Sequence, residues 1–293
     1  MSQQLKLGIP KGSLQKSTID LFAQAGWNIQ DRSRNYFPSI DDPEINCALV
    51  KPQEMAPFCA DGTLDVGLTG YDWILEQNCE DKIHELGVLE YSKSSDHGCR
   101  WVVVVPKDSP IQKLEDLHGK KVATELINTT KRLFTERGVE AEIHYSWGAT
   151  EAKVVEGLMD AVVEITETGS TIRAHGLRVV EDLLYTNTRM IASPEAMRDP
   201  WKRAKIEQLH LMLNASLKAR LKAMIKLNVS DDNLEAVCQL LPSLHAPTVN
   251  RLNAKGWNAV ETVVDRKAIR DLVPKLVSAG AEGIVEYDLK KVV

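Results

Sequence analysis

The chain has 293 residues, of which 43% are hydrophobic and 26% charged, a composition typical of a soluble globular protein with two or three domains. Its 36 Lys and Arg residues against 41 Asp and Glu give a formal net charge of -5. This balance excludes a general attraction to nucleic acid or to an anionic membrane surface. An anionic substrate would therefore need a local basic site.

The cysteines are odd in number and widely spaced, and no Cys-x-x-Cys pair occurs; they are Cys47, Cys59, Cys79, Cys99 and Cys238. This usage indicates reduced thiols in a cytoplasm rather than disulfides or structural zinc. The N-terminal residues lack a basic region followed by a long apolar one, and no apolar run approaches about 18 residues. We therefore expect a cytoplasmic protein with neither a signal peptide nor a membrane span.

Strands and helices alternate from the start of the chain. Residues 5–9 have the two-residue apolar period of a strand, and residues 14–25 carry the apolar stripe of a helix that ends at Gly26. The turn between them, Pro10-Lys11-Gly12-Ser13, lacks the GxxxxGK spacing of a Walker A phosphate loop. The first loop is therefore a glycine turn between a strand and a helix.

The next segments repeat this alternation. Residues 45–50 indicate a strand with Lys51 at its end, residues 53–60 a short helix, and residues 64–68 a strand that enters Thr69-Gly70-Tyr71-Asp72-Trp73. Strands separated by short helices predict a parallel sheet.

A charged, glycine-containing stretch over residues 91–98 precedes the apolar run 100–105, which suits a buried strand in a second lobe. Residues 183–191 are expected to return the chain to the first lobe before a long helical segment that starts at Pro194. Two lobes joined by two crossing strands, with a cleft between them, follow from this pattern. The predicted division is lobe I over residues 1–95, completed by about 190–214, and lobe II over residues 96–189.

The most informative stretch is Asp160 to Thr171, DAVVEITETGST. Asp160 and Glu164 share one side of an extended segment, and the hydroxyl-rich turn after it opens a helix at Ile172. Unpaired N–H groups at such a helix start, together with hydroxyls, suit a phosphate. The two carboxylates could meet ribose hydroxyls or a magnesium ion. The alternative is an ordinary strand, a helix capped by Ser170 or Thr171, and a surface turn.

This acidic strand followed by Thr-Gly-x-Thr resembles the loop with which phosphoribosyltransferases hold phosphoribosyl pyrophosphate. With the following Ala-His-Gly-Leu, it is most similar to the ATP phosphoribosyltransferase family, whose members catalyse the first step of histidine biosynthesis. The turn at residues 10–13 is also typical of that family, although many members carry arginine where this chain has Ser13. The Asp-Gly-x-x-Asp-x-Gly-x-x-Gly pattern from Asp61 to Gly70 is a further resemblance, and its alternative is a set of tight strand-to-helix turns. Residues 114–123 resemble the second-domain entry of periplasmic-type solute-binding folds.

The last part of the chain, residues 217–293, predicts a separate small domain. A strand over residues 221–229 precedes a helix capped by Ser230 or Asp231, and two extended stretches and a second helix capped by Asp265 lead to a final strand at residues 284–287. This β-α-β-β-α-β order is that of a ferredoxin-like domain. The whole chain is thus expected to be an α/β protein, with a two-lobed periplasmic-binding-protein-like core and a ferredoxin-like C-terminal domain.

The C-terminal domain resembles the histidine-binding regulatory domain of the long form of ATP phosphoribosyltransferase, on the residues Leu241 to Val249 and the Gly280-Ala281 turn. The resemblance implies feedback inhibition by histidine at Leu244, Ala246, Thr248 and Gly283. It also implies a homo-oligomer, a hexamer by family, that needs no separate regulatory subunit.

The resemblance implies the chemistry as well. N1 of the adenine of ATP would attack the anomeric carbon of phosphoribosyl pyrophosphate, and pyrophosphate would leave with inversion while Mg²⁺ neutralises its charge. No nucleophilic triad is needed, and the sequence shows no obvious one.

The implied site residues fall into three groups. Asp160, Glu164 and Arg100 are the expected catalytic residues, with Mg²⁺ held by the substrate and, in one alternative, by Asp160 or Glu164. The expected donor-binding residues are Thr166, Glu167, Thr168, Gly169, Ser170 and Thr171, and the expected ATP-binding residues are Lys11, Gly12, Arg34, Lys51 and Gly70. His175 is given no catalytic role.

Two rival classes share parts of this pattern. A two-lobed binding or effector-sensing protein would have the same core without needing the acidic strand and its loop. An amino-acid sensor would account for the last 75 or so residues but not for the preceding ones.

Overall fold

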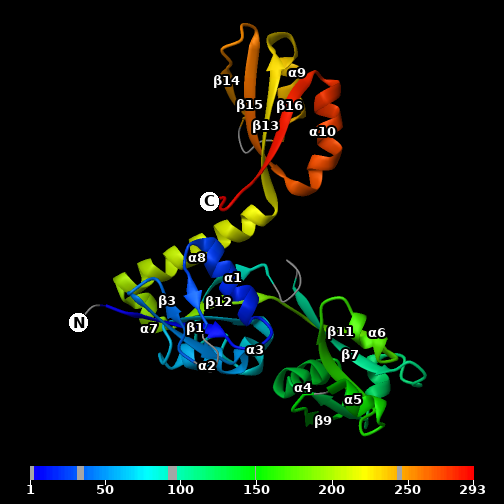
Figure 1. Cartoon of the computed structure of the whole chain (residues 1–293). Coiled ribbons are helices and arrows are strands. Elements are labelled where there is room, and N and C mark those ends of the chain that lie inside the picture. The colour runs from blue at the N-terminus through cyan, green and yellow to red at the C-terminus, as the bar shows by residue number, and fades with distance from the viewer. Residues whose placement is uncertain (1–2, 32–35, 92–97, 149, 243–245) are drawn as a thin grey trace. The chain divides into compact units, whose positions relative to one another are not determined.

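The computed structural model describes residues 3–31, 36–91, 98–148, 150–242 and 246–293. The chain forms two compact units (Figure 1), which are taken here one at a time. The first contains residues 1–23 and 27–210, and the second residues 24–26 and 211–293. Within the described residues no helix is long and apolar enough to cross a membrane.

The first unit contains two five-stranded sheets. In spatial order, the first sheet consists of β4 (Ile45–Val50), β1 (Leu5–Pro10), β5 (Val66–Gly70), β12 (Thr188–Ala192) and β6 (His84–Leu89). Its associated elements are the helices α1 (Gln15–Ala25), α2 (Pro52–Ala60), α3 (Tyr71–Glu76) and α7 (Pro194–Arg198), and the ribbon of β2 (Ile29–Gln30) and β3 (Ser39–Ile40). The apolar side chains of β1 are completely buried, as expected for a central strand covered on both faces.

The second sheet has the order β11 (Leu177–Thr186), β7 (Cys99–Pro106), β10 (Ala161–Thr166), β8 (Lys121–Thr124) and β9 (Glu142–Tyr145). Its helices are a 3-10 turn (Leu114–Leu117), α4 (Ile127–Glu136), α5 (Thr150–Val155) and α6 (Ser170–Ala174). Strands β8, β9 and β10 run parallel, so their carboxyl ends lie at the same edge of the sheet. That edge carries the loop predicted to hold phosphate.

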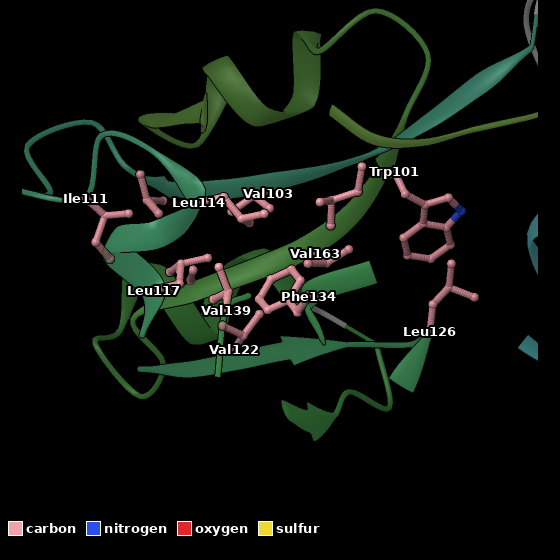
Figure 2. Packing of buried hydrophobic residues seen from close by; sticks show 13 residues of the cluster. Trp101, Val103, Ile111, Leu114, Leu117, Val122, Leu126, Phe134, Val139 and Val163 are labelled. Atoms are coloured by element: carbon pink, nitrogen blue, oxygen red, sulfur yellow. The ribbon is translucent and has the colours of Figure 1, made fainter. Parts of the chain in front are cut away.

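Side-chain alternation along β7 places apolar residues on both faces of this sheet. Trp101 and Val103 pack with Phe134 of α4 in one cluster, as Figure 2 shows, whereas Val102 and Val104 pack on the opposite face with Ile172 of α6. The predicted buried strand is therefore confirmed, and both its faces are covered by helices.

The chain crosses between the sheets twice, once after β6 and once at Asn187 between β11 and β12. The expected two-lobed core with two crossing segments is confirmed. The expectation that the first sheet would be parallel is correct only for β4, β1 and β5. Strand β12 enters from the other lobe and runs antiparallel to both β5 and β6, because a direct crossing brings the chain in at the opposite end.

The second unit contains an antiparallel sheet with the order β14 (Thr248–Arg251), β15 (Trp257–Asp265), β13 (Lys222–Ser230) and β16 (Ala281–Asp288). Two 3-10 turns (Asp231–Asn233 and Arg266–Ala268) precede α9 (Leu234–Leu240) and α10 (Ile269–Ser278), and the long helix α8 (Pro200–Arg220) precedes the sheet in sequence. Inward residues of β13 pack with Leu272 and Leu276 of α10. The ferredoxin-like order is confirmed.

The two carboxylates expected to cap helices in this unit have other partners. Asp231 accepts hydrogen bonds from Arg251 Nη1 (3.0 Å) and Asn258 Nδ2 (2.8 Å), and Asp265 forms an ion pair with Lys222 (2.7 Å). A 3-10 turn begins at Asp231 and another directly after Asp265, and no side chain caps the start of either turn.

Candidate active site

A cavity of about 560 Å³ lies in the first unit between residues of its two sheets. Most of its polar lining comes from the ends of strands and from the crossing segments. The polar and charged lining residues are Ser13, Asp72, Tyr91, Cys99, Glu151, Glu164, Thr166, Glu167, Thr168, Ser170, Thr171, Thr186, Asn187 and Thr188. Glycines 70 and 98 also line it, which lets backbone approach a ligand closely.

The loop after β10 forms one wall of the cavity. It turns at Gly169, whose φ of +71° is the left-handed conformation that glycine adopts without strain. The Gly169 N–H donates to Thr166 Oγ1 (2.8 Å), and the Ser170 N–H donates to Thr168 Oγ1 (3.3 Å). The alternative helix cap at Ser170 or Thr171 is not formed, because Gly169 occupies that position. Two threonine hydroxyls thus accept hydrogen bonds from N–H groups of the same loop and hold its conformation.

Glu164, the fourth of the six residues of β10, reaches the cavity. Burial, followed by the nearby carboxylates Glu151 and Glu125, raises the pKa of Glu164 to about 7, and a hydrogen bond from the Thr150 hydroxyl opposes this rise. A carboxylate with such a pKa changes charge near neutral pH, which is characteristic of functional sites.

Asp72, in the first turn of α3, is a second buried carboxylate on the cavity wall and only 2% exposed. It accepts hydrogen bonds from Trp101 Nε1 (2.7 Å) and Thr186 Oγ1 (2.9 Å). Burial raises its pKa even though these donors favour the charged form. A Cβ at Gly70 would lie 2.0 Å from Asp72 Oδ1, so glycine at residue 70 leaves room for this carboxylate.

Asp160 does not lie at the cavity, in contrast to the expectation from the sequence. It precedes β10, whereas the loop predicted to bind phosphate follows Glu164 at the other end of that strand, so the two are separated by the length of the strand. Its carboxylate accepts from the Lys121 N–H (2.9 Å) and lies 3.7 Å from Lys120 Nζ. The alternation along β10 was predicted correctly, but two residues on one face of a strand need not share a site.

Arg100 also has another partner. Its guanidinium donates to both carboxylate oxygens of Asp182 at 2.6 Å, and Tyr185 donates to the same carboxylate at 2.9 Å. Asp182 raises the pKa of Arg100. Arg100 is not among the residues that line the cavity, and its expected contact with a phosphate stays a prediction.

Two of the basic residues expected to meet ATP, Lys11 and Lys51, lie outside the cavity lining. Lys11 Nζ stands 3.9 Å from the centroid of the Tyr36 ring, and Lys51 is exposed directly before α2. Gly12 precedes Ser13, which does line the cavity, and Gly70 lines it directly. Arg34 lies outside the described residues.

Several lining residues were missed from the sequence. Glu151 lies 13 positions before Glu164 and reaches the cavity because α5 packs against β10. Thr186, Asn187 and Thr188 line it because the crossing segment passes along its wall. The residue types give no signal for this, since threonine and asparagine are common on ordinary strand ends.

The cavity lining is acidic. Among its described residues are Asp72, Glu151, Glu164 and Glu167, and no lysine, arginine or histidine. The described residues include no group of three Asp, Glu, His or Cys side chains arranged to hold a metal ion. Glu151 and Glu164 nevertheless offer the oxygen donors that Mg²⁺ prefers, and Mg²⁺ commonly takes only one or two carboxylates together with substrate phosphates.

The cysteines are free thiols, as expected. Burial raises the pKa of both Cys47 and Cys59 to about 12, which makes these thiols poor nucleophiles. At the cavity, Cys99 Sγ donates to Glu167 Oε1 at 3.8 Å, and burial raises its pKa to about 12 as well.

Three of the residues expected to bind histidine lie in the second unit, at opposite edges of its sheet. Ala246 is exposed just before β14, Thr248 begins that strand, and Gly283 lies in β16. Strands β15 and β13 separate the two edges, a distance of roughly 14 Å at about 4.8 Å per strand. Leu244 lies outside the described residues.

The fold and the cavity define an α/β protein with two lobes, a ligand cavity between their sheets and an additional ferredoxin-like unit. The family model described as ATP phosphoribosyltransferase matches residues 51–215, and the model of that family's C-terminal domain matches residues 219–291. The chain belongs to the ATP phosphoribosyltransferase family. The sequence resemblance indicated this fold and this family. It also indicated the assignment that goes with them, a pentosyltransferase of histidine biosynthesis.

Individual relatives agree with this assignment over the full length. The chain is 55% identical to the ATP phosphoribosyltransferase of Desulfosudis oleivorans over 293 residues, covering 100% of both chains, and 54% identical to that of Desulfatibacillum aliphaticivorans, covering 100% of this chain and 99% of the relative. Among solved structures, it is similar to an ATP phosphoribosyl transferase complex of two chain types from Thermotoga maritima. That match has a TM-score of 0.61 and 25% identity, and it covers 72% of this chain and 99% of the other.

Proposed function

We propose that this chain transfers the phosphoribosyl group of phosphoribosyl pyrophosphate to N1 of the adenine of ATP, and that the cavity of the first unit is its active site. The observation that carries the proposal is the presence of Glu164 and the loop from Thr166 to Thr171 on one cavity wall. The loop supplies backbone N–H groups and hydroxyls for the 5′-phosphate of the donor. Glu164 supplies a carboxylate for the ribose hydroxyls.

Catalysis in this proposal rests on alignment and charge stabilisation. Adenine N1 is unprotonated at neutral pH and already nucleophilic, so it forms the new bond to the anomeric carbon while the bond to pyrophosphate breaks with inversion. The chain holds donor and acceptor in line, which converts an encounter of two molecules into a step within one complex. The high pKa of the thiols at Cys47, Cys59 and Cys99 fits a reaction that needs no enzyme nucleophile.

The acidic lining affects how the two polyanionic substrates, ATP and phosphoribosyl pyrophosphate, enter this cavity. Carboxylates such as Glu151 and Glu167 repel phosphates unless a cation lies between them. We propose that Mg²⁺ arrives bound to the phosphates, and that Glu151 and Glu164 are the residues able to contact it. When bound, Mg²⁺ neutralises the charge of the departing pyrophosphate.

The second unit is proposed to bind histidine and to inhibit the enzyme. Residues of β14 and β16 lie at opposite edges of one sheet, so Thr248 and Gly283 of a single chain are too far apart to hold one small ligand. A site that uses both therefore joins two copies of the chain, as in a symmetric oligomer, with a hexamer as the proposed state. Since the chain carries this unit itself, no separate regulatory subunit is proposed.

A two-lobed binding protein without catalysis is the alternative. It would bind ATP or the donor in the same cavity but would not release pyrophosphate. The decisive experiment measures pyrophosphate release from ATP and phosphoribosyl pyrophosphate with Mg²⁺, comparing the wild-type chain with Glu164→Gln. We expect release by the wild type, and a loss of at least tenfold in kcat/KM for the donor in the variant with little change in ATP binding. Binding of both substrates without any release of pyrophosphate would exclude the transferase.

A further inference from the structure

Asn187 lies in the segment that crosses between the two sheets, and an arginine holds its side chain. Arg189 Nε donates a hydrogen bond to Asn187 Oδ1 at 3.2 Å. A guanidinium group has no acceptor, so the atom that it contacts must be the amide oxygen and not the amide nitrogen. The orientation of the Asn187 amide is therefore determined, and its NH₂ group lies on the side away from Arg189.

Two further contacts fix Arg189 itself. Its guanidinium forms an ion pair with Glu85 of β6 and lies over the Tyr71 ring, with Cζ 3.9 Å from the ring centroid. The Tyr71 N–H donates to the Asn187 carbonyl oxygen at 3.0 Å, which also fixes the backbone of the crossing segment. The Asn187 amide is thus held in one orientation before any ligand binds.

Asn187 keeps its hydrogen-bond donors for a ligand, whereas its two neighbours in the chain do not. Thr186 Oγ1 donates to Asp72 Oδ1 at 2.9 Å. Thr188 Oγ1 donates to the Tyr91 carbonyl oxygen at 3.1 Å. No residue in the described part of the chain accepts a hydrogen bond from Asn187 Nδ2.

The NH₂ group of Asn187 faces the cavity. Asn187 lines the cavity and Arg189 does not, so the open side of the amide is the side opposite Arg189. With its oxygen occupied, the amide offers donors only. It therefore suits an anionic acceptor better than the mixed donor and acceptor edge of adenine. Because the described lining has no lysine, arginine or histidine, such an oriented donor is valuable to a phosphate.

The position of Asn187 indicates which phosphate group it meets. Strand β7 lies between β10 and β11, where Arg100 is paired with Thr166 and Cys99 with Thr186. The hydroxyl-rich loop after β10 and the crossing segment after β11 therefore leave the sheet at the same edge, two strand spacings or about 10 Å apart. A donor whose 5′-phosphate occupies the loop extends across its ribose to the pyrophosphate over a comparable span.

We propose that Asn187 binds the pyrophosphate group of the donor and stabilises it as it leaves, and that Arg189 is a positioning residue that orients the Asn187 amide. When the bond from the anomeric carbon to pyrophosphate breaks, its electron pair goes to the pyrophosphate oxygen. A fixed N–H donor gains strength as this negative charge grows. The inference rests on the proposed function for the identity of the donor, but the contact with pyrophosphate is testable without turnover.

The test titrates the full chain with pyrophosphate and Mg²⁺ in a calorimeter, and separately with ATP. Asn187→Ala should weaken pyrophosphate binding about tenfold, because a hydrogen bond to a charged group is lost. Arg189→Met should weaken it severalfold. ATP affinity should stay unchanged in both variants, and the control Asn253→Ala, at an exposed position in the second unit, should change neither affinity.

The double variant tests whether Arg189 acts through Asn187. Pyrophosphate should bind Asn187→Ala with Arg189→Met no more weakly than it binds Asn187→Ala alone, since the amide to be oriented is already gone. Losses that multiply in the double variant would reject the positioning role. Melting temperatures of all variants separate these effects from a general loss of stability.

Turnover supplies the last measurement. In Asn187→Ala the kcat for pyrophosphate release should fall at least tenfold while the KM for ATP stays unchanged. Equal pyrophosphate affinity in wild type and Asn187→Ala, or weaker binding of ATP alone, would overturn the proposal. A wild-type chain that releases no pyrophosphate from the two substrates, yet binds pyrophosphate through Asn187, would reject the proposed function and leave the anion contact established.

Discussion

The carboxylate of Asp72 accepts a hydrogen bond from the indole N–H of Trp101 at 2.7 Å, and this buried contact joins the first turn of α3 to strand β7 of the other sheet. The rings of Trp73 and Trp101 add an edge-to-face contact with centroids 6.4 Å apart. Thr186, at the end of β11, donates to the second oxygen of the same carboxylate. Asp72 therefore lies where both sheets and one crossing segment meet.

Replacing Asp72 by Ala should destabilise the first unit by about 2 kcal/mol, because two buried donors lose their acceptor. Asp72→Asn should cost less than half as much. Its amide oxygen can accept from Trp101 while its NH₂ group donates to Thr186 Oγ1, which accepts a second bond readily. Chemical denaturation followed by tryptophan fluorescence measures both changes. Equal losses in the two variants would contradict the assigned hydrogen bonds.

Gly169→Ala should reduce donor affinity beyond its effect on stability. Its φ of +71° disfavours any side chain, so a loss of about 1 kcal/mol in stability is expected. Gly138→Ala is the matched control, because Gly138 has the same φ of +71°, lies outside the cavity lining, and an added Cβ there meets nothing within 4 Å. Calorimetric titration with phosphoribosyl pyrophosphate and Mg²⁺ compares them. Only Gly169→Ala should weaken binding, by tenfold or more, and equal affinities would reject the loop as the phosphate site.

Glu164→Gln should change the pH dependence of stability. The pKa of Glu164 is raised to about 7 from an ordinary 4.5, so the unfolded chain ionises first as the pH rises. Stability linked to this group is fully present below about pH 4.5 and is lost by about pH 7. The variant cannot ionise, so its melting temperature relative to wild type should rise by a few degrees between pH 5 and pH 8.

Scanning calorimetry at several pH values follows that difference. Glu156→Gln, at an exposed position, serves as the control and should show no such rise. A constant difference between Glu164→Gln and wild type across this range would mean that Glu164 ionises normally in the folded chain.

Glu76 should contribute more to the free energy of unfolding than its position on a short helix suggests. Its carboxylate accepts from the N–H groups of Asn128 (2.9 Å) and Thr129 (2.8 Å), in the first turn of α4, where no side chain of α4 itself forms a cap. Glu76→Ala should cost about 1–2 kcal/mol. Glu80→Ala removes only the partly exposed pair with Arg132 and should cost less than about 0.5 kcal/mol. Urea denaturation compares the two, and similar costs would rule out the capping role.

Gly283→Ala should weaken inhibition by histidine without changing the uninhibited rate. Gly283 has a φ of +60° in edge strand β16, and an added Cβ would lie 3.3 Å from Asn228 Nδ2. Gly256→Ala, in the turn between β14 and β15, is the control because its φ is +80° and the space around it is open. We expect the histidine concentration for half inhibition to rise at least tenfold only in Gly283→Ala. Light scattering with and without histidine should reveal whether the oligomer changes.

If inhibition is allosteric, histidine must favour one state of the enzyme, and ATP or the donor must in turn alter histidine affinity. Reciprocal titrations test this linkage. Inhibition strictly competitive with ATP, and equally sensitive in Gly283→Ala, would place histidine in the catalytic cavity instead.

The order of elements was predictable because it depends on local periodicity. One side of each strand or helix faces a core, and this leaves a periodic pattern of apolar residues in the sequence. Examples are the alternation along residues 5–9 and the helical stripe over residues 269–277. The loop from Thr166 to Thr171 was recognisable for a similar reason, since its glycine and hydroxyls are contiguous. Glu164, two residues before that loop, lies in the same cavity wall.

The sequence by itself determined the two-lobed core, the ferredoxin-like unit, the family and the position of the hydroxyl-rich loop that lines the cavity, because each is written in contiguous residues. Only the tertiary structure decided which charges meet. It directs Arg100 to Asp182, separates Asp160 from the cavity by the length of β10, and joins Asp72 to Trp101. Such pairings depend on how distant segments pack, and a charged side chain that is buried or half-buried takes the partner which that packing brings within reach.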